Sequence, residues 1–168
     1  MSPVIQPIAK QFALHTRLFN NVLEGVADEK GNQRLNQQVN HLQWIAGHLT
    51  NARYNQAPML GLTAVFPYKD LYTDASKPPP NNRAIDESIA YPSLAEILGY
   101  WNSFAAPFTE AVANMGEEQL AGKLPFGIPI GDNTILGLMA FLASHESSHI
   151  GQMSIIRKYI GLDAMSYK

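Results

Sequence analysis

The sequence contains no cysteine. Neither a disulfide framework nor a thiolate metal site can therefore form within this chain. The same absence means that a sulfur nucleophile, if the protein uses one, must arrive on a second substrate. A chain without cysteine also fits a reducing compartment.

Charge is scarce as well. Charged residues make up 15% of the 168 residues, the net charge is −2, and neither sign forms a long run. We therefore expect neither nucleic acid nor an anionic membrane surface as the main partner. Hydrophobic residues make up 46% of the chain, so we expect one globular domain over residues 1–168.

Long hydrophobic runs are also missing. The longest, residues 135–143 (ILGLMAFLA), is about half of the roughly 20 residues that a membrane-spanning helix needs. The first residues, MSPVIQPIAKQFALHT, lack the basic start, apolar segment and cleavage site of a secretory signal. We therefore expect a cytoplasmic protein that does not enter a membrane.

Apolar residues recur at helical spacing in four segments, at about residues 3–26, 35–56, 93–115 and 132–160. Ser93 and Glu96 have the spacing of a capping box at the start of the third segment, and Gly161 is suited to end the fourth. Residues 58–92, between the second and third segments, are too many for a tight turn. The sequence predicts an all-α fold, a four-helix bundle with a long connection between helices 2 and 3.

Residues 145–149 read His-Glu-Ser-Ser-His, which matches the H-E-x-x-H signature of zinc peptidases. On a helix, His145 and His149 lie about 40° apart on one face, so one metal ion can bind both. The other peptidase ligands are absent, because Ile155 stands where a third histidine would be and no glutamate follows Glu146. The sequence therefore argues against a peptidase but leaves a histidine pair at ligand spacing.

A third ligand would have to come from upstream. His41 and His48 both lie on a buried shoulder of the second predicted helix, and spacing alone does not choose between them. For His41, near the helix start, a surface or boundary position is favoured. His15 lies on the apolar stripe of the first helix, as a hydrogen-bonded interior side chain or as part of the same cavity. The alternative to a metal site is two separate core histidines at 145 and 149, each with its own hydrogen bond.

The second and last helices together resemble a known family. Trp44-x-x-x-His48, followed by His145-x-x-x-His149-x-x-Gln152, resembles the DinB-like superfamily, and the helix order and the long connection agree over most of the chain. The resemblance implies a four-helix bundle with a three-histidine site for a divalent metal, usually zinc or nickel, and often a homodimer. It selects His48 as the third ligand beside His145 and His149.

Other residues are expected around this site. Gln152, one turn after His149, is placed to steady the floor of the pocket, and Trp44 and His15 are expected to line it or to support the ligands. Glu146 departs from the family pattern. It could hydrogen-bond the second nitrogen of a ligand, act as a catalytic base towards metal-bound water, or lie at a helix interface, and the supporting roles outweigh the catalytic one.

Some members of this family resemble thiol-dependent S-transferases that use a low-molecular-weight thiol, and others resemble metal hydrolases. The leading expectation is a metal-dependent S-transferase acting on a small-molecule substrate. The alternatives are a metal-dependent hydrolase, a non-catalytic bundle that binds metal or a ligand, and a plain bundle that dimerises. Tyr68, Lys69 and Tyr72, with Arg53 and Tyr54, could form a rim for the thiol, or these aromatic residues could only seal the end of the bundle.

Overall fold

Four long helices form the framework of the structure, a computed structural model that describes residues 1–77 and 81–167. They are α1 (Gln6–Leu23), α3 (Leu42–Tyr54), α4 (Leu94–Ala113) and α6 (Ile135–Tyr159), and the short elements are α2 (Asp28–Gly31), the 3-10 helix η1 (Lys69–Leu71) and α5 (Glu117–Ala121). Within the described ranges no strand forms, and extended backbone pairs only in isolated bridges. The structure agrees with the prediction of an all-α fold.

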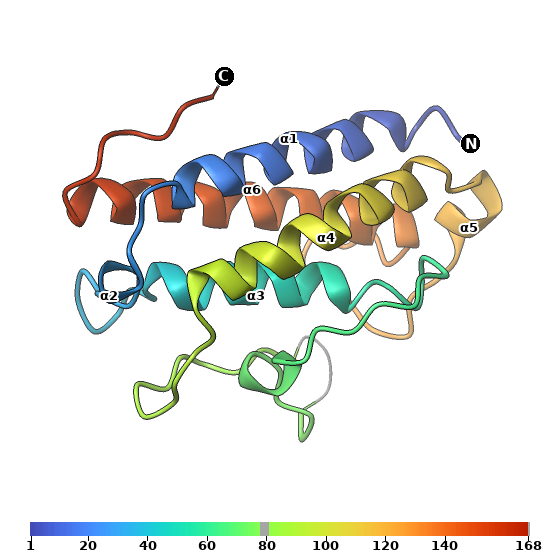
Figure 1. Ribbon diagram of the computed structural model, residues 1–168. Coiled ribbons are helices and arrows are strands. Elements are labelled where there is room, and N and C mark those ends of the chain that lie inside the picture. Colours follow the sequence, from blue (N-terminus) through green and yellow to red (C-terminus); the bar gives the residue numbers. More distant parts are fainter. Residues whose placement is uncertain (78–80, 168) are drawn as a thin grey trace.

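The long helices pack against one another around a shared core. Helix α1 contacts α4 and α6, and α3 contacts the same two helices. In Figure 1, α1 lies along α6, and α4 passes across α3. Buried apolar side chains from all four helices form a single cluster. The arrangement brings α3 against α6, the two helices that carry the predicted metal ligands.

Helix α1 follows the predicted pattern but ends early. Pro7 lies in its first turn, where the missing N–H of proline has no partner to lose. Phe12 and Phe19 on its apolar stripe are fully buried. The helix ends at Leu23 and not at residue 26, and Gly25 just beyond it adopts a φ of 73°, which glycine takes without steric cost.

Helix α3 is shorter than the sequence predicts. The apolar spacing predicted a helix over residues 35–56, but the helix begins at Leu42. His41 is extended, and its Nδ1 accepts a hydrogen bond from the backbone N–H of Trp44 at 3.0 Å, so this side chain caps the helix. The predicted start was wrong because histidine is not among the usual N-cap residues, and the apolar spacing upstream resembles that of a helix.

The starts of α4 and α6 are close to the predicted ones. The capping box is present, since the Ser93 hydroxyl accepts from the Glu96 N–H at 3.2 Å and the Glu96 carboxylate accepts from the Ser93 N–H at 2.9 Å. The Thr134 hydroxyl accepts from the Gly137 N–H at 3.0 Å at the start of α6. Gly161, with a φ of 90°, follows the last turn of α6 as predicted.

The connection between α3 and α4 is long, as predicted for residues 58–92, of which 78–80 lie outside the described residues. It places Phe66 and Tyr72 in the core, where they are 3% and 0% exposed. Tyr72 packs so closely on α3 that a Cβ atom at Gly47 would lie 1.9 Å from its hydroxyl oxygen. The connection is therefore part of the packed structure and covers one face of α3.

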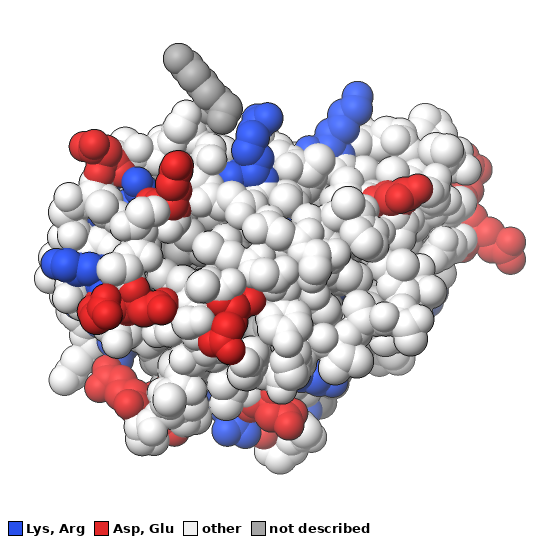
Figure 2. Space-filling model, in the orientation of Figure 1, with Lys and Arg blue, Asp and Glu red and all other residues white. Residues whose placement is uncertain are grey.

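Charged side chains lie in small groups on the surface. On the face drawn in Figure 2, acidic and basic groups are mixed and wide areas carry no charge, so this face has no extended area of one sign. Across the described ranges, no helix combines the length and the apolar character that crossing a membrane requires.

Candidate metal centre

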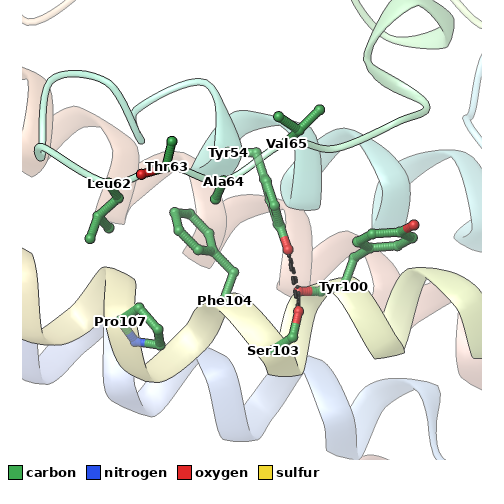
Figure 3. A pocket seen from close by; sticks show the side chains of 9 residues that line it. All are labelled: Tyr54, Leu62, Thr63, Ala64, Val65, Tyr100, Ser103, Phe104 and Pro107. Atoms are coloured by element: carbon green, nitrogen blue, oxygen red, sulfur yellow. Dashed lines mark hydrogen bonds between the residues drawn. The ribbon is translucent and has the colours of Figure 1, made fainter.

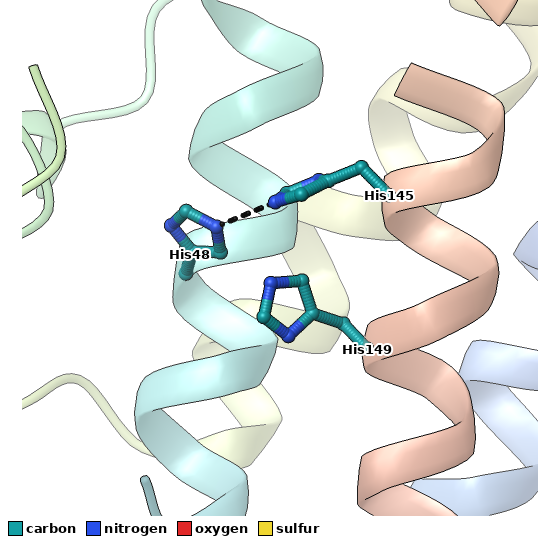
Figure 4. Close-up of side chains that lie close together, drawn as sticks. All are labelled: His48, His145 and His149. Carbon is teal, nitrogen blue, oxygen red and sulfur yellow. Dashed lines mark hydrogen bonds between the residues drawn. The ribbon is translucent and has the colours of Figure 1, made fainter. Parts of the chain in front are cut away.

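Three histidines from two helices converge between α3 and α6. His48 comes from α3, and His145 and His149 come from successive turns of α6 (Figure 4). Each offers one ring nitrogen, and these three atoms lie within 4.8 Å of one another. His48 is buried, whereas His145 and His149 are half-buried. The structure thus brings together the three residues that the sequence and the family resemblance selected.

The spacing of the ring nitrogens fits a single divalent ion. The Nε2 atoms of His48 and His145 are 3.1 Å apart. Two nitrogens bound tetrahedrally to one zinc ion at 2.0–2.1 Å would be about 3.3 Å apart. The ring of His149 is 4.5 Å from that of His145 and 5.1 Å from that of His48, measured between centroids. Small side-chain rotations would therefore suffice to place the three rings around one ion.

The histidines are held in their neutral form. Burial, followed by the neighbouring His145 and His149, lowers the pKa of His48 to about 3. Burial also lowers the pKa of His145 to about 4, and it lowers the pKa of His149. A metal ion binds only an unprotonated imidazole nitrogen. The site is therefore ready to bind an ion at neutral pH without first losing protons.

Neighbouring side chains orient the rings. Gln152 Oε1 lies 2.9 Å from His149 Nδ1, so an Nδ1–H donated to this oxygen leaves the Nε2 of His149 free. The Trp44 ring stacks on His48 with the centroids 4.9 Å apart and the planes 9° apart. Gln152 and Trp44, which the sequence assigned to the surroundings of the site, thus contact two of the three histidines directly.

The rings of His48 and His145 pack against aromatic side chains. Among the described residues, the buried Nδ1 atoms of His48 and His145 have no hydrogen-bond partner. Trp44 covers His48, and the Phe141 ring lies 6.0 Å from that of His145 at an interplanar angle of 32°. Both nitrogens are thus available to carry the proton when Nε2 binds an ion, which agrees with the chemistry of imidazole ligands.

His41 lies outside the cluster. Its side chain is 5% exposed, caps α3 through Trp44, and makes an edge contact with Tyr91 at 5.6 Å. The expectation of a surface or boundary position for His41 is therefore wrong. Its position seven residues before His48 could not reveal this role, because the sequence pattern placed the helix start further upstream.

Glu146 lies at the interface of three helices. Its carboxylate accepts hydrogen bonds from Arg53 of α3, with Nε to Oε1 at 2.6 Å and Nη2 to Oε2 at 2.9 Å. His15 of α1 places its Nδ1 3.1 Å from Oε2. Burial alone would raise the pKa of Glu146, but the Arg53 guanidinium, helped by His15, holds this pKa below its ordinary value. The sequence left three roles open for Glu146. Its contacts match one of them, a position at a helix interface.

Two of the residues considered for a rim of the site are buried elsewhere. Arg53 is 2% exposed and pairs with Glu146, and Tyr72 is fully buried against α3. The interpretation of these two side chains as a rim for a thiol is therefore wrong. No local sequence pattern indicates the pairing of Arg53, because its partner Glu146 lies 93 residues away.

A separate pocket of about 320 Å³ lies between α3, α4 and residues 62–65 (Figure 3). None of the clustered histidines lines it. The hydroxyl groups of Tyr54 and Ser103 in this pocket already have partners, since Tyr54 donates to the Tyr100 carbonyl at 2.9 Å and lies 3.3 Å from the Ser103 hydroxyl. The histidine cluster is therefore the better candidate for the functional site.

Comparison with known proteins agrees with this choice. A family model described as the DinB superfamily matches residues 11–153, a range that contains the three histidines and Gln152. A comparison with curated proteins found no match.

Proposed function

The chain belongs to the DinB superfamily, and from this premise we propose that it is a metal-dependent enzyme whose divalent ion, zinc or nickel, is held by His48, His145 and His149. Family membership and the three-histidine cluster fit a metal-binding protein. The observation that carries the proposal is the convergence of three ring nitrogens within 4.8 Å, from α3 and α6. Three protein ligands with a further position open are typical of catalytic metal sites and not of structural ones.

The ligands of this site are neutral, so a bound ion would keep its full positive charge. Three neutral imidazoles add no negative charge, and an ion so bound strongly lowers the pKa of a water or thiol that it coordinates. Gln152 holds the ring of His149, and Trp44 covers that of His48, so the ligands are oriented before the ion arrives. We assign no catalytic proton transfer to Glu146, because Arg53 and His15 occupy its carboxylate.

We propose thiol S-transfer as the reaction. The chain has no cysteine, so the sulfur must come from a low-molecular-weight thiol as a second substrate. The thiol gives up its proton to water, its sulfur forms a bond to an electrophilic carbon of the other substrate, and the leaving group departs with the electron pair of the broken bond. A metal-dependent hydrolase is the second candidate, because the same ligand set also suits the activation of water. A non-catalytic metal or ligand site is the third.

We further propose a single-domain four-helix bundle that works as a cytoplasmic homodimer. The bundle is supported by the contacts of both α1 and α3 with α4 and α6. The dimer rests on the family resemblance.

Metal analysis and a thiol titration test the proposal. Protein purified without chelator should carry about one equivalent of divalent metal, and the His48→Ala variant less than about a tenth. In cobalt-loaded protein, a small thiol should produce a sulfur-to-cobalt charge-transfer band, and an electrophile such as 1-chloro-2,4-dinitrobenzene should then be consumed with the thiol.

Other outcomes would favour the alternative functions. Bound metal without thiol binding, together with ester or amide hydrolysis, would favour the hydrolase. An ion without an exchangeable ligand would favour the non-catalytic site.

A further inference from the structure

We infer that a buried ion-pair network of Arg53, Glu146 and His15 positions the metal ligands. This inference rests on the proposed function, because it concerns how the chain keeps the three imidazoles at metal-binding distance. Arg53 lies five residues after His48 on α3, and Glu146 directly follows His145 on α6. The network therefore joins the two ligand-bearing helices close to the ligands themselves.

The hydrogen bonds of Arg53 in this network are directional and join several helices. Arg53 binds the Glu146 carboxylate through two nitrogens, at 2.6 and 2.9 Å. Its other hydrogen bonds reach α1, with Nη1 to the Thr16 hydroxyl at 2.8 Å and Nη2 to the Phe12 carbonyl at 3.0 Å. Its guanidinium carbon lies 3.7 Å from the ring centroid of Trp101 on α4. One side chain of α3 is thus tied to all three other long helices.

Stability alone does not explain such a pair. Arg53 and Glu146 are each 2% exposed, and desolvation of two buried charges cancels much of their attraction. Apolar residues of similar volume often replace a buried ion pair with little loss of stability, or with a gain. The directional bonds of the pair are therefore better explained by the geometry that they impose.

Helix α6 needs such a constraint. Its apolar side chains are spread around its circumference more evenly than those of α1, so the helix is only weakly amphipathic. Apolar burial is non-directional, and on such a helix it specifies rotation and axial position poorly. Metal–ligand distances, in contrast, tolerate deviations of only about 0.2 Å. The bidentate pair with Arg53 fixes the rotation of α6, and hence where His145 and His149 point.

The decisive variant removes the pair and keeps its volume. In Arg53→Met/Glu146→Leu, we expect a denaturant midpoint of the metal-free protein close to that of wild type, together with a Kd for Co²⁺ that rises about 10- to 100-fold. The visible absorption of the bound cobalt should also change, because it reports the ligand geometry. In metal-free wild type, imidazole ring protons of His48 and His145 should show nuclear Overhauser contacts, as their Nε2 atoms are 3.1 Å apart, and the double variant should lose these contacts.

Two further variants test the inference even if the double variant does not fold. Arg53→Lys preserves the charge but not the bidentate geometry, so it should weaken Co²⁺ binding about 10-fold or more. Tyr54→Phe is the matched control, because Tyr54 lies on the same helix but bonds to Tyr100 of α4. It should lower the denaturant midpoint while the Co²⁺ affinity stays within about twofold of wild type.

The outcomes separate this inference from the proposed function. If wild type binds no Co²⁺, the proposed function fails, while the nuclear Overhauser contacts still decide whether the network holds the two rings together. If wild type binds Co²⁺ and both network variants retain its affinity, its spectrum and the ring contacts, the positioning role is overturned and the proposed function stands.

Discussion

At the scale of single residues, the five histidines show how the surroundings decide what an imidazole does. His48, His145 and His149 converge on one point and are kept neutral by burial. His41 accepts a backbone hydrogen bond at a helix start, and His15 contacts a buried carboxylate. The helical spacing of the pair on α6 was visible in the sequence, whereas the choice between residues 41 and 48 needed the family pattern.

Removal of a single imidazole from the cluster should empty the site. His48→Ala, His145→Ala and His149→Ala should each reduce bound metal below about a tenth of an equivalent, since two remaining imidazoles rarely hold a divalent ion. Circular dichroism should show that the helices persist, and elemental analysis measures the metal. His41→Ala is the control: it should keep its metal but lose about 1 kcal/mol of stability with the cap. A variant at 41 that loses its metal while His48→Ala retains it would contradict the assignment.

At the scale of single elements, α3 joins the ligand site to the rest of the structure. One face presents His48 to α6, another accepts Tyr72 at Gly47, and its start depends on His41. The capping box of α4 could be predicted, because Ser93 and Glu96 interact locally. The start of α3 could not, because a histidine cap and the packing of a distant tyrosine leave no local pattern in the sequence.

The close packing at Gly47 predicts opposite effects for the same substitution on two helices. Gly47→Ala would place a Cβ atom 1.9 Å from the Tyr72 hydroxyl oxygen, and overpacking of this kind costs about 1–3 kcal/mol. Gly151→Ala on α6 meets nothing within 4 Å and should stabilise the helix by up to about 1 kcal/mol. Denaturant unfolding measures both, and a Gly47→Ala variant as stable as wild type would show that Tyr72 is not packed as described.

The cap of α3 should make stability depend on pH. Burial, followed by the nearby Arg34, lowers the pKa of His41 from 6.5 to about 4. Between these values the unfolded chain binds a proton that the folded protein does not. This difference in proton binding makes the folded protein most stable above pH 6.5 and lowers its free energy of unfolding as the pH falls towards 4, at up to about 1.4 kcal/mol per pH unit.

His41→Asn isolates this contribution, because asparagine caps a helix but does not titrate in this range. The free energy of unfolding of metal-free protein, measured by urea between these pH values, should fall less steeply for the variant than for wild type. Parallel curves would mean that His41 titrates normally in the folded protein.

At the scale of the whole molecule, the order of the long helices and the connection between α3 and α4 followed from the sequence. Helical periodicity and turn residues are local signals, and the structure agrees with them except at the end of α1 and the start of α3. The contacts of Arg53 and Glu146 could not be predicted in this way, because their partners lie 93 and 131 residues apart in the chain. A sequence pattern shows that a charged residue lies among apolar ones, but it does not show which charged residue will pair with it in the fold.

Metal binding should stabilise the whole fold, because the cluster spans two helices that are distant in sequence. At a free ion concentration 100 times the Kd, the free energy of unfolding should rise by about 2.7 kcal/mol. Thermal unfolding of wild type with increasing Zn²⁺ or Ni²⁺ measures this as a rising Tm. His145→Ala should show no such rise; an equal rise in that variant would place the ion elsewhere.

X-ray absorption at the metal edge tests the central claim most directly, on protein purified without chelator. A site made by residues 48, 145 and 149 predicts about three imidazole nitrogens at 2.0–2.1 Å from the ion, with at least one further ligand that a small thiol can replace. A coordination shell without imidazoles, or one that is complete without an exchangeable ligand, would contradict it.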